Sequence, residues 1–403
     1  MKLEHLLASR MSRMKASEIR ELLKLLDQPD IISFAGGIPD ASLFPDEKFQ
    51  AAYRRIFSSD VKETALQYSV SEGYGPLRTW LVGRMKTLGV TCSEDNILIT
   101  SGSQQALEFL GKLFLSKDDT ALVGWPTYLG ALSAFNACEP VFDKFDIHAN
   151  RTTASYQDKA RAAGGAVKFA YMSVDFANPT GETLSKYERE RTLDFAADMD
   201  IALIEDAAYQ GLRYDGDDIP PILALELERN PDINAARTIY CGSFSKTLAP
   251  GLRVGWVCGA KSVISKLVLM KQAADLHSST INQIVAEDVI KEGFEAHIAG
   301  LRSAYKTRRD TMLGALDKNM PDGVSWTKPE GGMFIWVSLP NHMDGAELLA
   351  RSLKTQKVAF VPGGAFFPDG SGQNHIRLSF SVSTPDEIRE GIGRLGQVIS
   401  AAM

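Results

Sequence analysis

Short apolar runs alternate with amphipathic stretches through the middle of the chain. The apolar runs lie at residues 96–100, 121–124, 169–174, 201–204, 239–242 and 254–258. Runs of this length that end in glycine-rich or polar turns are typical of buried strands, and the stretches between them carry apolar residues at helical spacing. The alternation predicts an α/β fold with a mostly parallel sheet flanked by helices.

The C-terminal third has a different pattern. A long amphipathic stretch over 293–316 and a closing stretch with Ile388, Ile392, Leu395 and Ile399 predict two helices. Short apolar strands are expected between them, at 332–337, 358–361 and 376–380. We therefore predict a second, smaller α+β domain.

A chain of 403 residues is long enough for two domains or more. We expect a large domain over 46–290, and a small domain that combines the N-terminal arm 1–45 with 291–403. No internal repeat or low-complexity stretch is visible.

The composition, with 44% hydrophobic and 23% charged residues, is that of an ordinary globular protein. A net charge of -6 argues against nucleic acid or an anionic membrane as a partner. No apolar run has the length of a membrane span, and residues 1–13 show no export signal, so a cytoplasmic protein is expected. The scattered histidines predict no metal site, and reduced thiols are expected at Cys92, Cys138, Cys241 and Cys258.

The stretch 239–255 joins an apolar strand to small and hydroxyl residues, one lysine and one arginine. If Lys246 were partly removed from water beside Arg253, both effects would lower its pKa and favour a neutral amine that can attack a carbonyl. Ser243 and Ser245 could hold a phosphate together with Arg253. A lysine in a serine-rich turn can equally be a solvated residue, and composition alone favours that interpretation.

Polar residues also follow the other predicted strands. The turn 101–104, Ser-Gly-Ser-Gln, leads into a helix, whose N-terminus attracts anions. Asn178 opens an Asn-Pro-Thr-Gly turn, and Asp206 ends a strand three residues before Tyr209. Turns and acidic helix caps of this kind also occur without any ligand. In an open α/β sheet, however, such strand ends converge on one crevice.

The sequence Ser-Phe-Ser-Lys-Thr-Leu-Ala-Pro-Gly-Leu-Arg-Val-Gly at 243–255 closely resembles the lysine loop of class I/II aminotransferases. These are enzymes of fold type I that use pyridoxal 5'-phosphate (PLP), and the resemblance spans essentially the whole chain. It implies that Lys246 forms a Schiff base with the cofactor aldehyde and that Arg253 binds the cofactor phosphate. It also implies that Tyr68 reaches the phosphate in a neighbouring subunit.

The resemblance implies further contacts with the cofactor. Tyr128 would lie flat against the pyridine ring, and Asn178 would donate to its phenolic oxygen. Asp206 would face the ring nitrogen and Tyr209 the ring oxygen, which suits the chemistry because a carboxylate keeps the nitrogen protonated and the ring electron-withdrawing. The expected walls of the phosphate site are Ser101, Gly102, Ser103, Gln104, Ser243, Ser245 and Arg253.

One motif departs from the family pattern. The usual lead-in to the asparagine turn is Pro-x-x-Gln-Asn-Pro, and here Val174 and Ala177 occupy the proline and glutamine positions. The departure concerns secondary contacts and leaves Asn178 in place.

The resemblance also implies where the substrate binds. Gly37, Asn178 and Arg377 would hold it, with the backbone of Gly37 and the guanidinium of Arg377 on the α-carboxylate. An internal salt bridge would serve Arg377 equally well. The stretches 18–25 and 34–40 look most like the 2-aminoadipate and kynurenine aminotransferase subgroup, in which the first of them borders the substrate pocket.

Arg20 lies at the fringe of a predicted helix over 17–26. Its simplest interpretation is a solvated helix arginine. If the subgroup resemblance holds, Arg20 is the candidate for binding an acidic substrate side chain.

The expected activity is transfer of an amino group between an L-amino acid and a 2-oxo acid, with 2-oxoglutarate as the expected acceptor, by ping-pong chemistry. Lys246 would both anchor the cofactor and move the proton at the substrate Cα. The expected partners are small molecules, and a homodimer with shared active sites is expected because of Tyr68. A PLP-dependent β-lyase or decarboxylase would keep the same lysine. A noncatalytic PLP-binding regulator is less favoured, since such regulators carry an N-terminal DNA-binding domain.

Overall fold

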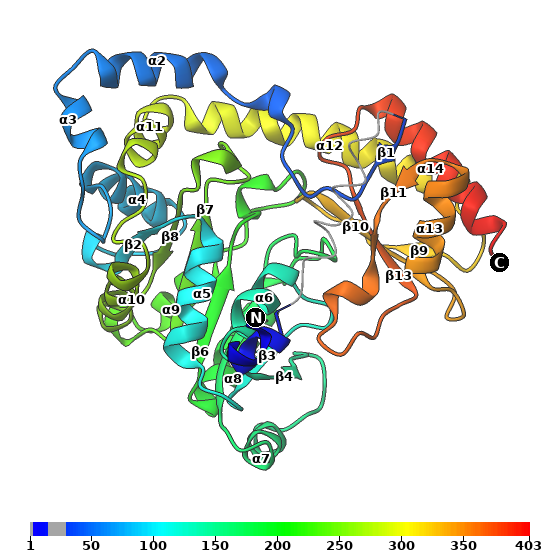
Figure 1. The fold of residues 1–403 in the computed structure, drawn as a ribbon, viewed down its shortest axis with the longest axis horizontal. Coiled ribbons are helices and arrows are strands. Elements are labelled where there is room, and N and C mark those ends of the chain that lie inside the picture. Colours follow the sequence, from blue (N-terminus) through cyan, green and yellow to red (C-terminus); the bar gives the residue numbers. More distant parts are fainter. Residues whose placement is uncertain (1–2, 15–29) are drawn as a thin grey trace.

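The fold is seen in a computed structural model, which describes residues 3–14 and 30–403. A large twisted sheet with helices on both faces forms one side of the molecule, and a smaller sheet with the C-terminal helices forms the other (Figure 1). The predicted helix over 17–26, with Arg20, lies outside the described residues.

The large sheet has seven strands in the order β2-β8-β7-β6-β5-β3-β4. Only β8 runs antiparallel to its neighbours, so the prediction of a mostly parallel sheet is confirmed. The strands are β2 (Ile97–Thr100), β3 (Thr120–Val123), β4 (Val141–Lys144), β5 (Val167–Met172), β6 (Ala202–Asp206), β7 (Thr238–Ser243) and β8 (Gly255–Cys258).

Side chains of these strands alternate between two buried layers, as the pleat requires. Phe169 and Tyr171 of β5 face a cluster with α5, α6 and α10, whereas Ala170 and Met172 face a cluster with α7, α8 and α9. The helices around the large sheet are α2 (Asp46–Phe57), α3 (Val61–Leu66), α4 (Gly75–Thr87), α5 (Ser103–Phe114), α6 (Leu129–Asn136), α7 (Thr153–Ala162), α8 (Lys186–Met199), α9 (Ile222–Arg229), α10 (Lys261–Ala274) and α11 (Thr280–Ile290).

The smaller sheet is antiparallel, in the order β12-β13-β10-β9. Its strands are β9 (Ser325–Trp326), β10 (Phe334–Ser338), β12 (Val361–Pro362) and β13 (His375–Ser379). It is accompanied by α12 (Phe294–Asn319), α13 (Gly345–Thr355) and α14 (Pro385–Ser400), and α12 packs along α14 (Figure 1). A capping box of Thr384 and Glu387 starts α14.

The described residues of the N-terminal arm divide between the two sides of the molecule. Its strand β1 (Ile32–Ser33) pairs in parallel with β11 (Val358–Ala359). Ser9 and Arg13, in contrast, donate hydrogen bonds to Glu139 and to the Pro140 carbonyl, beside the large sheet. The limits of the two domains stay a prediction. Within the described ranges, none of the helices combines the length and apolar character that a membrane span requires.

Candidate active site

The carboxyl ends of β2, β3, β5, β6 and β7 lie at one edge of the large sheet, because these strands run in the same direction. The loops that leave this edge carry most of the predicted site residues, while Arg253 lies just before β8, which starts at the same edge. The sequence prediction of one crevice at the strand ends therefore agrees with the topology.

Lys246 follows β7 and is partly buried. Its Nζ donates a hydrogen bond to the Gly37 carbonyl at 2.9 Å and lies 5.9 Å from the centre of the Tyr209 ring. Burial lowers the pKa of Lys246 to about 8, with further lowering by Arg377 and then Arg253. A larger fraction of this lysine than of an ordinary lysine is therefore neutral near neutral pH, and one cause is Arg377 on the distant strand β13.

Asp206 is the last residue of β6 and is 4% exposed. Its Oδ2 accepts a hydrogen bond from the Tyr171 hydroxyl at 2.8 Å, whereas its Oδ1 is buried without a partner. Burial raises the pKa of Asp206 to about 6, although the Tyr171 hydroxyl and Lys246 favour the charged form. A buried carboxylate oxygen without a donor is costly, so this atom is suited to receive a ligand N–H.

Gly102 and Arg253 form a close contact at the start of α5. Gly102 has φ 80°, and a Cβ atom there would lie only 2.4 Å from Arg253 Nη2. The same Nη2 donates to the Ser101 carbonyl at 3.2 Å. A guanidinium is thus held against a helix N-terminus, where backbone N–H groups and the helix dipole already favour an anion.

The other polar residues around this cradle differ in what they can offer. Ser243 Oγ accepts a hydrogen bond from the Ser245 N–H at 3.1 Å, so the Ser243 hydroxyl proton is free for another acceptor. Ser101 instead donates its N–H to Gln105 Oε1 at 2.9 Å and its hydroxyl to Asp275 Oδ2 at 3.1 Å. Ser101 therefore shapes the turn, and both of its donors are already engaged.

Arg377 on β13 is a buried cation, 2% exposed. It donates to Asn178 Oδ1 at 2.7 Å and to the Ala35 carbonyl at 2.9 Å, and its Nε is buried without a partner. Burial lowers the pKa of Arg377 to about 10. No carboxylate forms an ion pair with it in the described part of the chain, so the arrangement favours an anionic ligand over an internal salt bridge.

Gly37 lies beside this arginine. A Cβ atom at Gly37 would meet Phe334 Cζ at 2.7 Å and Arg377 Nη2 at 3.8 Å, so a larger residue would displace the Phe334 ring. The backbone of Gly37 thus lies between Lys246 and Arg377.

Two tyrosines close the site. Burial raises the pKa of Tyr128 to about 12 and also raises the pKa of Tyr209, which keeps both phenols protonated. Tyr209 packs edge to face against Phe334, with 5.6 Å between ring centres. Both side chains can therefore donate hydrogen bonds or cover a flat ligand near Lys246.

Comparisons with known proteins bear on this arrangement. Residues 30–395 match the family model for aminotransferase class I and II. The chain is 40% identical to aromatic-amino-acid aminotransferase 1 of Thermococcus litoralis, over 97% of this chain and 93% of that protein. The chain belongs to the class I and II aminotransferases. This aminotransferase is also 38% identical to the 2-aminoadipate transaminase of Thermus thermophilus, over 97% of this chain and 96% of that one.

A solved structure confirms the fold of the aminotransferase. The kynurenine aminotransferase of Pyrococcus horikoshii in complex with PMP aligns with a TM-score of 0.91 and 41% identity, over 100% of this chain and 98% of that one. The fold type I architecture, PLP-dependent transamination and the PLP cofactor predicted from the sequence are thereby confirmed.

The residues of the site fit that cofactor. Asp206 Oδ1 is a buried acceptor in need of a donor, and the Arg253 guanidinium can lie against the start of α5 only because residue 102 has no side chain. Both features suit a flat cationic ring that carries a dianion at one end.

One predicted residue, Tyr68, lies apart from these side chains. Tyr68 is 78% exposed, and its ring meets His277 edge to face at 6.0 Å. No described hydrogen bond or ring contact joins it to Lys246 or Arg253. Arg20 lies outside the described residues.

The sequence did not indicate Tyr171, Ala35 or Phe334. Tyr171 was hidden in an apolar strand, where its hydroxyl near the strand end was the only signal. Ala35 contributes its backbone carbonyl, which any residue could offer, and Phe334 contributes the bulk of its ring beside Gly37. Neither contribution can be recognised from the residue type.

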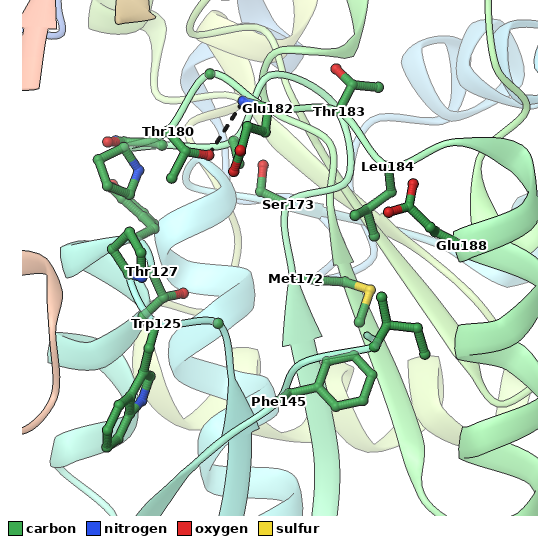
Figure 2. A pocket seen from close by; sticks show the side chains of 18 of the residues that line it. Trp125, Thr127, Phe145, Met172, Ser173, Thr180, Glu182, Thr183, Leu184 and Glu188 are labelled. Carbon is green, nitrogen blue, oxygen red and sulfur yellow. Dashed lines mark hydrogen bonds between the residues drawn. The ribbon is translucent and has the colours of Figure 1, made fainter. Parts of the chain in front are cut away.

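A cavity of about 760 Å³ lies beside the aminotransferase site. It shares Tyr128 and Asn178 with the site but does not include Lys246. Figure 2 shows Phe145 and Met172 facing this space. The position of the active site is therefore inferred from the contacts of Lys246 and not from this cavity. The cavity is a neighbouring space that shares Tyr128 and Asn178 with the site described above.

Proposed function

We propose that this aminotransferase moves an amino group from an L-amino acid to a 2-oxo acid, with 2-oxoglutarate as the main acceptor, in two successive half-reactions. The observation that carries the proposal is Lys246: a partly buried amine with a lowered pKa, held at Gly37 and surrounded by Asp206, Tyr209 and Arg377. When bound, PLP supplies the carbonyl that takes up the amino group and a ring that withdraws electrons from the substrate Cα.

Each part of the cofactor has a proposed partner in the site. Asp206 would accept a hydrogen bond from the protonated ring nitrogen and so favour its charged form, since Oδ1 of this carboxylate is buried without a donor of its own. Asn178 and Tyr209 would hold the ring oxygen, and Tyr128 would cover the ring. The phosphate is assigned to Arg253, to Gly102, Ser103 and Gln104 at the start of α5, and to the hydroxyls of Ser243 and Ser245.

Lys246 is proposed to anchor the cofactor and then to move the proton at the substrate Cα. A general base works best when its pKa lies near the working pH, because it is then available in the neutral form and still basic. The pKa of about 8 meets that condition. Arg377 contributes to it, so the residue proposed to bind the substrate also tunes the base.

Substrate orientation is assigned to Arg377 and Gly37. A planar guanidinium fixes two carboxylate oxygens at once, and Arg377 is buried without a carboxylate partner of its own in the described residues. Both half-reactions then hold the α-carboxylate in one place. The relatives named for aromatic amino acids, 2-aminoadipate and kynurenine support a broad range of long or aromatic donors, with Arg20 assisting acidic side chains.

The enzyme is proposed to act as a homodimer with shared sites. Tyr68 is largely exposed, and so are Leu66 (70%) and Val70 (59%) two positions before and after it, so this segment carries apolar side chains that a second copy could cover. Tyr68 of one copy would then reach the phosphate site of the other.

The test is a screen of amino donors against 2-oxoglutarate and pyruvate with the PLP-loaded enzyme. The proposal predicts glutamate or alanine formation from aromatic and acidic donors, with parallel double-reciprocal plots for the two substrates. Release of ammonia or carbon dioxide without a new amino acid would instead support a lyase or a decarboxylase.

A further inference from the structure

A buried lysine that the proposed mechanism does not use lies behind the phosphate cradle. Lys271, in the last turn of α10, is 0% exposed. Its Nζ donates to Gln105 Oε1 at 2.8 Å and to Asp275 Oδ1 at 3.0 Å. Burial lowers the pKa of Lys271 while the ion pair with Asp275 opposes that shift. Lysine is almost never fully buried unless it is paired, so a specific role is worth seeking.

Asp275 and Gln105 carry the contact on to Ser101. Asp275 Oδ2 accepts the Ser101 hydroxyl at 3.1 Å and Gln105 Nε2 at 2.8 Å. Gln105 Oε1, which accepts from Lys271, also accepts the Ser101 N–H at 2.9 Å. The N–H and the hydroxyl of Ser101 are thus held by Gln105 and Asp275, and Lys271 donates hydrogen bonds to both of these residues.

The remaining polar group of Ser101 faces the cradle. Its carbonyl accepts from Arg253 Nη2 at 3.2 Å, and the next residue, Gly102, approaches that guanidinium so closely that a Cβ atom would lie at 2.4 Å. A small rotation of the Ser101–Gly102 backbone would therefore move the guanidinium or the first N–H groups of α5. Hydrogen bonds to charged groups lose strength quickly when their geometry changes.

We propose that Lys271 and Asp275 are positioning residues for the cofactor phosphate, which they serve by holding Ser101 so that Gly102 and Arg253 form the phosphate cradle. This inference rests on the proposed assignment of the phosphate to Arg253 and the start of α5. Neither residue is among those assigned to the phosphate, and Lys271 acts through Gln105, which is 166 positions away in the chain.

The test compares PLP with pyridoxal, which lacks the phosphate. Both are titrated into the cofactor-free enzyme and into its Lys271→Met and Asp275→Ala variants, and Kd is measured from the change in absorbance or tryptophan fluorescence. Each variant should bind PLP about ten- to a hundredfold more weakly, the equivalent of one charge-assisted hydrogen bond, with pyridoxal affinity unchanged.

Lys112→Met is the matched control. Lys112 lies on α5 and pairs with Glu108 four residues away at 2.6 Å, but it is exposed, so both affinities should stay as in the unaltered enzyme. Asp275→Ala separates positioning from simple charge, because removing a carboxylate near a phosphate would tighten binding if charge alone mattered. If Lys271→Met fails to fold, the Asp275→Ala variant by itself still tests the positioning role.

The proposal is overturned if Asp275→Ala binds PLP as tightly as the unaltered enzyme or more tightly. It is also overturned if the affinities for PLP and pyridoxal fall by the same factor, which would indicate general damage to the fold. An unaltered enzyme that binds both compounds equally would contradict the phosphate assignment itself, and so would be distinguishable from failure of the positioning role alone.

Discussion

Lys246, Asp206 and Arg377 place two cations and one carboxylate in a region largely closed to water. Each is shifted in the direction that its burial requires: the pKa of Lys246 falls to about 8, that of Asp206 rises to about 6 and that of Arg377 falls to about 10. Asp206 and Arg377 also act on Lys246 with opposite signs. The basicity of Lys246 therefore depends on Asp206 at the end of β6 in the large sheet and on Arg377 in β13 of the small sheet.

Tyr171 offers a test of the role of Asp206. Its hydroxyl stabilises the charged form of that carboxylate, so Tyr171→Phe should raise the Asp206 pKa above about 6. A carboxyl with a raised pKa loses its charge first as the pH falls, so the deficit in kcat/KM should be larger at pH 6 than at pH 8. Loss of one hydrogen bond to a charged group predicts about a tenfold decrease at the lower pH.

The matched control is Tyr156→Phe, on α7, which removes a buried tyrosine hydroxyl away from the site and should leave the pH profile of kcat/KM unchanged. A Tyr171→Phe enzyme with the same deficit at every pH would show that Tyr171 acts by packing, and not through the charge of Asp206.

Arg20 is tested by substrate comparison. Arg20→Ala should lower kcat/KM about ten- to a hundredfold for acidic substrates, because one charge-assisted hydrogen bond is lost. Apolar and aromatic donors should be little affected. Equal losses for both kinds of substrate would indicate a structural role, and no loss for either would indicate a solvated helix arginine.

At the scale of the elements, a largely buried ion cluster links the loop after β5, helix α8 and the segment before β10. Asp175 Oδ1 accepts from Arg189 at 2.6 Å and from Arg213 at 3.4 Å, and Arg213 also pairs with Glu330 at 2.8 Å. Asp175 lies three residues before Asn178 and directly before Phe176, which has a left-handed φ of 52°. The cluster thus anchors the loop that aims Asn178 at Arg377.

Asp175→Ala should destabilise the protein strongly, because it leaves Arg189, 0% exposed, without its carboxylate. Removing one partner of a buried pair typically costs about 3–5 kcal/mol of unfolding free energy. Asp194→Ala, which breaks the exposed pair of α8 with Arg229, should cost under about 1 kcal/mol. Urea unfolding of the cofactor-free forms measures both, and similar losses in the two variants would contradict a special role for the cluster.

Much of the element pattern could be predicted, since buried strands read as apolar runs. The partly exposed edge strand β4 and the two-residue strand β9 were not predicted, because neither has enough buried side chains to give an apolar run in the sequence. The run at 358–361 looked like one strand, yet its halves pair with different partners, β1 and β13. Pairing between distant segments is not encoded in local periodicity.

The same limit applies to the site. Lys246, Asp206 and Asn178 stood out because polar residues at the ends of apolar strands carry a local signal. Lys271 and Asp175 did not, because each also has a partner in a distant segment, Gln105 for Lys271 and Arg213 for Asp175, and local sequence does not show these contacts. The roles assigned to the site residues and the domain limits remain predictions.

At the scale of the whole molecule, the exposed Tyr68 predicts that activity needs two chains. Lys246→Ala and Tyr68→Phe chains, each impaired alone, should regain activity when they are unfolded together and refolded as a mixture, because one of the two sites in a hybrid dimer keeps both residues. About a quarter of the unaltered activity is expected for random pairing, since half of the dimers are hybrids with one intact site.

Two controls fix the interpretation. A mixture of Lys246→Ala with Asp206→Ala chains should regain nothing, since both residues are proposed to serve the same site within one chain. Full activity of a monomer in sedimentation at assay concentration would contradict the shared site.

The central claim is that Lys246 holds the cofactor, and it is tested most directly by trapping. The PLP-loaded enzyme is reduced with borohydride, digested, and the phosphopyridoxyl group is located by peptide mass spectrometry. The account predicts one modified residue, Lys246, and no stable adduct in Lys246→Ala after washing. An adduct at another lysine of the unaltered enzyme, with Lys246 unmodified, would contradict it.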